Sequence, residues 1–322
     1  MEEQLIQKYE ELKIAIKKLD SAIVAFSGGI DSTLMLKIAY DVLKDKAIAV
    51  TADSPSLPRK ELEETKKITQ QIGARHLIIG TEETTNENYL KNPSNRCYYC
   101  KSELYSKLKS VSAQIGTKNI INGTNFDDLG DYRPGLAAAD ENNVISPLKD
   151  AEITKAEVRE LAKHLGLEIW NKPSSPCLSS RVPYGQEITM KKLSMIEQAE
   201  GFLKNFGIKE LRVRHFGELA RIEVSENEKS IISHNFNLIQ EKFNDIGFKK
   251  IEIALHKIFR EQRPQRHTKH FADTARRSYG SFHNCRYAST RSISTWSAAS
   301  SWKKIGECAE MSANRRHRRS RR

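Results

Sequence analysis

The sequence has no run that approaches the ~20 apolar residues needed for a membrane-spanning helix. Its N-terminus is acidic and amphipathic, whereas a secretory signal is basic and then apolar. Cysteine is also scarce, with five residues in 322, an odd number for a set of structural disulfides. These absences exclude a membrane span and disfavour a secreted scaffold, so we expect a cytoplasmic protein without a membrane partner.

Excess positive charge is missing from most of the chain, although the formal net charge is +12. Residues 256–322 contain 17 Lys and Arg against 4 Asp and Glu, which leaves 36 against 37 in residues 1–255, the body. The near-neutral body gives no electrostatic reason to bind a nucleic acid. The segment 256–322 is rich in Arg and Ser without an apolar period, so we expect little packed structure there. We favour a solvated or non-native extension over an Arg-rich nucleic-acid-binding arm.

Short apolar runs alternate with segments of helical periodicity through the first half of the chain. Strands are predicted at residues 22–26, 47–51, 76–79 and 119–122, and helices at 5–19, 33–43, 59–72, 101–115 and 155–165. This alternation predicts a doubly wound α/β domain, residues 1–172, whose parallel sheet is covered on both faces.

A Pro- and Ser-rich stretch, residues 172–183, interrupts this pattern and predicts a linker or a functional loop. Beyond it, helices are predicted at 191–206 and 231–243, a hairpin at 211–215 and 220–224, and a strand at 250–255. That order predicts a smaller α+β domain, residues 173–255, before the segment 256–322.

A glycine pair separates the first predicted strand from its helix, in the run Ser27 to Ser32 (SGGIDS). Gly28 and Gly29 can adopt backbone angles that turn successive amide N–H groups toward one point, and the helix N-terminus adds positive potential. Asp31 can hold Mg²⁺ or orient the loop. The run lacks the Lys of a kinase-type loop and the third glycine of a dinucleotide fingerprint. It therefore predicts an anion cradle of another kind, with a plain tight turn as the alternative.

The run resembles the phosphate loop of the ATP-pyrophosphatases, which cleave ATP to AMP and pyrophosphate while adenylating a substrate. The resemblance implies that Ser27 to Ser32 hold the pyrophosphate, that Thr51 to Ser54 lie near adenosine, and that residues 122–128 complete the site. Without the resemblance, Asp127 and Asp128 after a strand are a candidate metal site, although adjacent acids more often belong to a solvated loop. The implied ATP-binding residues are Ala25, Phe26, Ser27, Gly28, Gly29, Ile30, Asp31, Ser32, Thr51, Asp53, Ser54, Gly123, Asp127, Arg133 and Arg181.

Three cysteines of the body call for an explanation, Cys97 and Cys100 in a Cys-x-x-Cys and Cys177 in the Pro- and Ser-rich stretch. A zinc site needs a fourth ligand, and a redox pair needs no third cysteine. Three ligands on a [4Fe-4S] cluster would leave one iron open to bind sulfide. Unrelated cysteines remain the plain alternative, because spacing alone does not show convergence.

Two further stretches, residues 131–135 (DYRPG) and 176–185 (PCLSSRVPYG), resemble the LarE group of ATP-dependent sulfur transferases. This group builds the nickel-pincer nucleotide cofactor of lactate racemase, and the resemblance spans about residues 5–255. Some members sacrifice the sulfur of one cysteine, the position of Cys177 here. Others also carry a Cys-x-x-Cys and are thought to hold a [4Fe-4S] cluster. The cysteine pattern favours a cluster on Cys97, Cys100 and Cys177, with the sacrificial route as the alternative.

The same resemblance implies the substrate, pyridinium-3,5-biscarboxylic acid mononucleotide. Its phosphate would be clamped by Arg212 and Arg214, with Glu200 in the same pocket. On spacing alone, a solvent-facing strand edge explains the two arginines equally well. The partners implied are a sulfur donor, other proteins that mature the nickel-pincer cofactor, and further copies of this chain in a homo-oligomer.

The hypothesis that follows is an acyl transfer to sulfur. A substrate carboxylate attacks the α-phosphate of Mg-ATP, and sulfide or the Cys177 thiolate then displaces AMP from the acyl-adenylate. A tRNA thiolase is the nearest rival, and ATP-driven amidation leaves the cysteines unexplained. A nucleic-acid-binding module working through residues 256–322 is the rival outside enzymes.

Deleting residues 256–322 separates these alternatives. We expect ATP-dependent thiolation to survive the deletion, because the phosphate loop and the three cysteines lie in the body. Any affinity for nucleic acid should vanish. The comparison uses product analysis and a filter-binding assay, with circular dichroism as the control for folding. Thiolation lost from a folded truncation would contradict this assignment.

Overall fold

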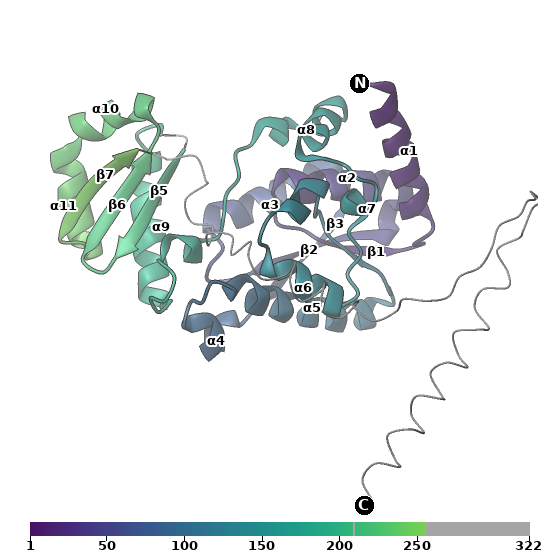
Figure 1. Cartoon of the computed structure of the whole chain (residues 1–322), viewed down its shortest axis with the longest axis horizontal. Helices are drawn as coiled ribbons and strands as arrows, with labels where there is room; N and C mark the ends of the chain where they lie inside the picture. The colour runs from purple at the N-terminus through teal and green to yellow at the C-terminus, as the bar shows by residue number, and fades with distance from the viewer. Residues whose placement is uncertain (209, 256–322) are drawn as a thin grey trace, which may run out of the picture. The chain divides into compact units, whose positions relative to one another are not determined.

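The first sheet of the protein is parallel and lies within a run of alternating strands and helices (Figure 1). A computed structural model of the protein describes residues 1–208 and 210–255. The strands are β1 (Ala22–Ala25), β2 (Ala47–Asp53), β3 (Arg75–Gly80) and β4 (Ile120–Ile121), in the order β3-β2-β1-β4. The helices are α1 (Glu3–Lys17), α2 (Ile30–Leu43), α3 (Arg59–Ile72), α4 (Glu87–Leu90), α5 (Arg96–Ile115), α6 (Pro134–Glu141), α7 (Pro147–Asp150) and α8 (Lys155–His164). Within the described ranges, no helix is long and apolar enough to span a bilayer.

Both faces of this sheet are covered, because successive residues of a strand point to opposite sides. Ala22 and Val24 of β1 join a core with α1, α2 and α8, whereas Ile23 joins a second core with α5 and α6. In β2, Ala49 joins the first of these cores and Val50 joins the second. The doubly wound α/β fold predicted from the sequence is therefore confirmed.

The strand order places the loop after β1 at a reversal point of the sheet. Strand β1 pairs in parallel with β2 on one side and with β4 on the other. This is a topological switch point of the sheet, the position at which open α/β sheets bind ligands. The glycine run follows β1, and Gly123 follows β4.

A second, smaller sheet has its own core. Strands β5 (Leu211–Phe216) and β6 (Leu219–Val224) are antiparallel, and β7 (Lys250–Leu255) pairs in parallel with β6. Helices α9 (Met190–Lys204), α10 (Glu226–His234) and α11 (Phe236–Ile246) contribute to this core together with Val213 and Ile222. The predicted boundaries at residues 172 and 255 stay predictions.

Three expectations about helices were wrong in detail. The helix predicted over residues 231–243 is two helices that meet at Asn235, whose side chain donates to the Ile231 carbonyl at 2.8 Å and competes with the helical pattern. Helix α5 begins at Arg96, five residues early, so the Cys-x-x-Cys lies on the helix. Helix α2 begins at Ile30, so Asp31 and Ser32 lie in its first turn.

Replacing Gly123 by Ala should destabilise the fold. A Cβ there would lie 2.6 Å from the amide nitrogen of Ser32, and neither backbone can yield easily. Overpacking of this kind costs about 1–3 kcal/mol. Urea unfolding measures the change, and Gly80→Ala is the matched control, because no atom lies within 4 Å of its added Cβ. Equal midpoints for the two variants would refute the close approach.

Candidate active site

The glycine run forms a tight turn that leads directly into α2. Gly28 adopts a left-handed φ of 72°, and a Cβ there would lie 2.9 Å from the Thr65 side chain on α3. The Ser32 hydroxyl lies 3.1 Å from that of Ser27 and donates to the Gly29 carbonyl at 3.0 Å. Hydrogen bonds within the turn and the contact with α3 therefore hold the turn in place. Its amides lie at the positive end of a 14-residue helix.

Not every residue of this run is available to a ligand through its side chain. Phe26 and Ile30 are buried in the core shared by α1, α2 and α8. Ala25 ends β1 and packs against the opposite core. These three predicted residues can therefore contribute backbone groups, while Ser27, Gly28, Gly29 and Ser32 line the turn itself.

Asp31 is engaged by two donors. The Lys155 ammonium lies 2.5 Å from Asp31 Oδ2, and the Asn125 amide donates to Asp31 Oδ1 at 3.1 Å. Both carboxylate oxygens are bonded within the protein, which fits the orienting role predicted for Asp31, and its magnesium-holding role stays a prediction. Lys155 also places a cation beside the glycine run, whose own sequence contains none.

The segment after β4 is fixed by reciprocal capping. Asp127 accepts the backbone N–H of Lys155 at 2.8 Å, at the start of α8. Asp128 accepts the Asn125 N–H and pairs with Arg133 at 2.7 Å. Burial raises the pKa of Asp128, although Arg133 acts in the opposite direction. The predicted residues Asp127 and Arg133 thus lie in one network with Asp31, through Lys155, Asn125 and Asp128.

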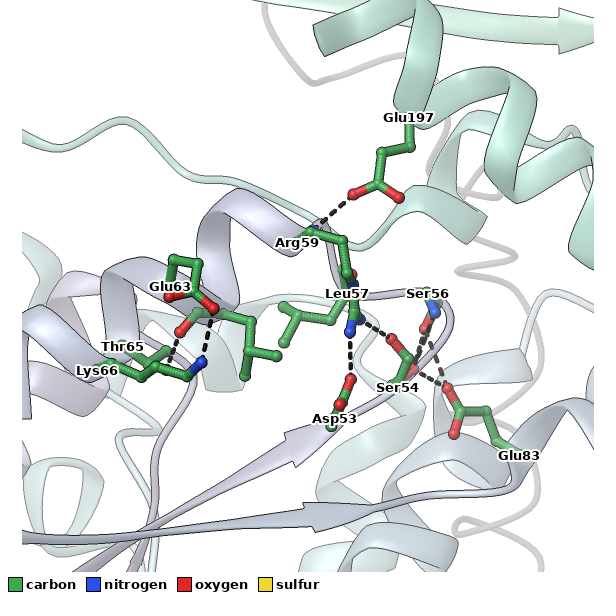
Figure 2. A network of polar contacts seen from close by, with 11 residues as sticks. Asp53, Ser54, Ser56, Leu57, Arg59, Glu63, Thr65, Lys66, Glu83 and Glu197 are labelled. Atoms are coloured by element: carbon green, nitrogen blue, oxygen red, sulfur yellow. Dashed lines mark hydrogen bonds and ion pairs between the residues drawn. The ribbon is translucent and has the colours of Figure 1, made fainter.

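The end of β2 is organised by a buried carboxylate, Glu83 (Figure 2). Ser54 donates to Glu83 Oε1, and the Ser56 hydroxyl donates to the same oxygen at 3.1 Å. Arg59 pairs with Asp53 and donates to the Ser54 carbonyl at 2.6 Å. These bonds tie the end of β2 to Glu83 and to the first residue of α3.

Thr51 lies deeper in the same strand. It is 1% exposed, and its hydroxyl lies 2.8 Å from His76 Nε2 on β3. Burial lowers the pKa of His76, and the charge of Lys66 acts in the same direction, so this ring is neutral near pH 7. Of the three predicted residues on this edge, Asp53 has the exposed side chain and Thr51 serves the packing.

The three cysteines of the body lie within electrostatic range of one another. Cys97 and Cys100 occupy the first turns of α5, and Cys177 precedes a 3-10 helix, Leu178–Arg181. Burial raises the pKa of Cys100 to about 12, and the charges of Glu83 and Cys177 act in the same direction. Within residues 1–208 and 210–255, however, no group of three or more His, Cys, Asp or Glu side chains is arranged to hold a metal ion.

A buried guanidinium faces these thiols. Arg96 is 4% exposed and donates to the Asn92 amide oxygen at 2.5 Å and to the Ser179 carbonyl at 2.8 Å. Burial alone lowers the pKa of Arg96, but the charges of Cys177 and Cys97 outweigh it and the pKa is raised. The structure therefore holds a fixed cation within electrostatic range of Cys97 and Cys177.

Three arginines gather beside β5. Arg181 forms two hydrogen bonds with Glu200 of α9, at 2.9 and 3.2 Å, and Arg214 pairs with Glu223 at 2.5 Å. Burial lowers the pKa of Arg212 to about 10, and repulsion from Arg181 and Arg214 contributes. The structure therefore brings Arg181, predicted for ATP, into the group predicted for the substrate phosphate.

The alternative of a solvent-facing strand edge does not describe Arg212. It lies opposite Glu223 on the face turned away from the core of the second sheet, yet it is only 7% exposed. The Leu178–Arg181 helix contacts β5 here, and Arg214 donates to the Ser180 carbonyl at 3.2 Å. The stretch predicted as a linker or a functional loop is thus packed against β5.

Four polar residues near these groups were not predicted from the sequence: Glu83, Arg96, Lys155 and Lys172. Lys155 carried a usable signal, since it opens a helix after Thr154 with Glu157 three residues beyond the cap. The other three are recognisable only through contacts made by residues distant in sequence.

Comparison with known proteins gives consistent results. The sequence matches the NAD synthase family over residues 4–100. It is 45% identical over 253 residues to an uncharacterised protein of Synechocystis sp., covering 78% of this chain and 94% of that protein. It is 34% identical over 252 residues to the pyridinium-3,5-bisthiocarboxylic acid mononucleotide synthase of Lactiplantibacillus plantarum, covering 78% and 91%. An uncharacterised protein of Methanocaldococcus jannaschii is 32% identical over 252 residues, covering 78% and 96%.

The raised pKa of Cys100 predicts how its alkylation depends on pH in metal-free protein. Because the thiolate is the nucleophile, the rate of Cys100 alkylation should rise about tenfold per pH unit from pH 7 to pH 10. Peptide mass spectrometry after iodoacetamide treatment measures each cysteine separately. Cys100→Ser is the control for peak assignment, and a Cys100 rate that levels off near pH 8.5 would contradict the raised pKa.

Proposed function

We propose a function from one premise: the chain belongs to the LarE-type family of PP-loop proteins, the family of the pyridinium-3,5-bisthiocarboxylic acid mononucleotide synthase of Lactiplantibacillus plantarum. Membership supports an ATP-dependent enzyme. We propose in addition that the enzyme is a sulfurtransferase, which adenylates a substrate carboxylate and converts it to a thiocarboxylate. The acceptor proposed is pyridinium-3,5-biscarboxylic acid mononucleotide, in the biosynthesis of the nickel-pincer nucleotide.

The observation that carries this proposal is the turn between β1 and α2. Gly28 approaches α3 and Gly123 approaches the first turn of α2, so closely that neither position accommodates a Cβ. Backbone amides fixed in this way at a helix N-terminus stabilise a leaving pyrophosphate without reorganising. The nearby Lys155 ammonium adds positive charge to the same turn.

The first half-reaction joins a carboxyl group to AMP. A carboxylate oxygen of the substrate attacks the α-phosphorus of ATP, the bond to the bridging oxygen breaks, and pyrophosphate leaves with its electron pair. The residues of the turn hold the departing phosphates. Asp53 and Ser54 hold the adenosine part of ATP. Bonds to Glu83 and Arg59 keep this edge of the sheet in position.

The second half-reaction forms the carbon–sulfur bond. The Cys177 thiolate attacks the carbonyl carbon of the acyl-adenylate, and AMP leaves. Residue 177 would then lose its Cα proton to a base, and the Cβ–S bond would break with its electron pair going to sulfur, which releases the thiocarboxylate and leaves dehydroalanine. The support for this route is the Arg96 guanidinium, which lies so close to Cys177 that the charge of Cys177 raises the pKa of Arg96.

We propose that Arg212 and Arg214, with Arg181, bind the phosphate of the acceptor. The support is the mutual repulsion among these guanidinium groups, which an anion would relieve. Glu200 contributes by fixing Arg181, and it also accepts the Val213 backbone N–H at 3.0 Å.

The [4Fe-4S] cluster stays a prediction. The three thiols are near one another, yet they are not arranged as a set of ligands in the described part of the chain, so we derive no step through a cluster. A cluster on Cys97, Cys100 and Cys177 would supply an exchangeable sulfide. Mg²⁺, the sulfur donor, the maturation partners, the homo-oligomer and the cytoplasmic location likewise stay predictions, and residues 256–322 lie outside the described residues.

The proposed reaction has a defined product set. Purified protein given ATP, Mg²⁺ and the biscarboxylic acid mononucleotide should form AMP, pyrophosphate and a thiocarboxylate, because the turn holds the β- and γ-phosphates together. Chromatography with mass spectrometry identifies all three. Formation of ADP in place of AMP would overturn the proposal.

Two further measurements on the same protein identify the source of the sulfur. Anaerobic purification with iron and sulfide analysis tests for a cluster, and peptide mass spectrometry tests residue 177 after turnover. The sacrificial route predicts loss of hydrogen sulfide from Cys177 without bound iron. Cys97→Ser is the matched control, since it should leave that route intact and abolish a cluster.

A further inference from the structure

Lys172 makes three contacts that the proposed chemistry leaves unexplained. Its ammonium lies 2.8 Å from Glu61 Oε2, 2.8 Å from Glu64 Oε2 and 3.3 Å from the carbonyl oxygen of Gly28. The Lys172 and Glu61 side chains are 15% and 14% exposed. A cation is thus held at one point by two carboxylates of α3 and by the backbone of the glycine turn.

The contact with Gly28 fixes the orientation of one peptide group. No peptide bond in residues 1–208 and 210–255 is cis, so the Gly28 carbonyl and the Gly29 N–H point in opposite directions. A carbonyl drawn toward Lys172 and α3 therefore turns the Gly29 N–H away from them. Gly29 is the N-cap residue of α2, where an N–H group is available to an anion.

Glycine makes this orientation depend on an external contact. Residues without a Cβ reach both signs of φ at similar cost, so a Gly-Gly peptide can flip where other sequences resist. The φ of 72° at Gly28 is one of its accessible states. Thr65 limits the space beside Gly28, and Lys172 provides the polar bond on that side.

The charge of Lys172 matters as well. Glu61 and Glu64 lie one turn apart on α3, facing the ammonium that contacts the glycine turn. Unpaired, two carboxylates here would repel a polyphosphate. Burial lowers the pKa of Lys172, but its bonds to Glu61 and Glu64 outweigh that effect and the pKa is raised, so the cation persists at neutral pH.

We propose that Lys172 is a positioning residue for ATP, which holds the Gly28–Gly29 peptide with its N–H directed to the β- and γ-phosphates. The inference rests on the proposed function of the glycine turn. Lys172 also begins the stretch that carries Cys177, so the same contact ties the start of the sulfur-bearing segment to the phosphate site.

The test compares ATP with AMP, which lacks the β- and γ-phosphates. Titration calorimetry of Lys172→Met should show ATP binding weakened at least about tenfold, which equals about 1.4 kcal/mol. AMP affinity should stay within about twofold, an outcome that general damage to the fold would not give. Lys66→Met is the matched control, because Lys66 pairs with Glu63 on the same helix (Figure 2).

A triple variant separates orientation from charge balance. In Lys172→Met, Glu61→Gln, Glu64→Gln the carboxylates are gone, and we expect ATP binding to remain about tenfold weak. Recovery to the wild-type affinity would mean that Lys172 only neutralises Glu61 and Glu64, and would overturn the proposal. If Lys172→Met fails to fold, the triple variant carries the ATP and AMP comparison.

A crystal structure with a non-hydrolysable ATP analogue tests the remaining alternative. The Lys172 ammonium should stay on the Gly28 carbonyl, and an ammonium found on a phosphate oxygen would make Lys172 a direct ligand and overturn its positioning role. Because these experiments measure binding, they are independent of sulfur chemistry. A wild-type protein that binds ATP but forms no thiocarboxylate would refute the proposed reaction and leave this comparison intact.

Discussion

Two close contacts hold the start of α2 in place. Gly28 contacts α3, and Gly123 contacts the first turn of α2, each at a distance that excludes a methyl group. Protein interiors are packed as densely as organic crystals, so contacts this tight transmit displacement instead of absorbing it. The amides at the start of α2 are therefore set by β4 and α3 together, which is the kind of rigidity that electrostatic catalysis requires.

Charged groups of the candidate site are paired with one another. Asp31 is bonded to Lys155, and Arg181 to Glu200. The Arg181–Glu200 pair is buried, and breaking a buried pair is costly, because the remaining charge loses its compensation in a medium of low polarity. The Asp31–Lys155 pair is partly exposed, so exchanging its partners costs less.

The sequence was sufficient for the fold because its signals are local. The strand that ends at Ala25, the helix that ends just before Gly73 and the hairpin around Gly217 each follow from periodicity and a turn residue within a few positions. The break at Asn235 was missed because it depends on one side chain that competes with the helical backbone.

The site was predictable only where a motif is contiguous. The run from Ser27 to Ser32 was found in this way, and so were Asp127 and Arg133 through the family resemblance. Lys172 reaches Glu61 across 111 positions, and Arg96 reaches Ser179 across 83. No periodicity encodes such contacts, since they arise from the packing of elements whose relative placement the sequence does not state. Arg181 shows the same limit, because its partner Glu200 lies on a helix beyond the loop.

One contact links helix α3 to helix α9. The carboxylate of Glu197 on α9 accepts the backbone N–H of Arg59 at 2.6 Å, at the first residue of α3 (Figure 2). The first turn of α3 therefore takes a side-chain acceptor from α9, and local opening of α9 would leave the Arg59 N–H without that acceptor. The start of α3, the helix that carries Thr65 and Glu61 beside the glycine turn, is in this way linked to α9.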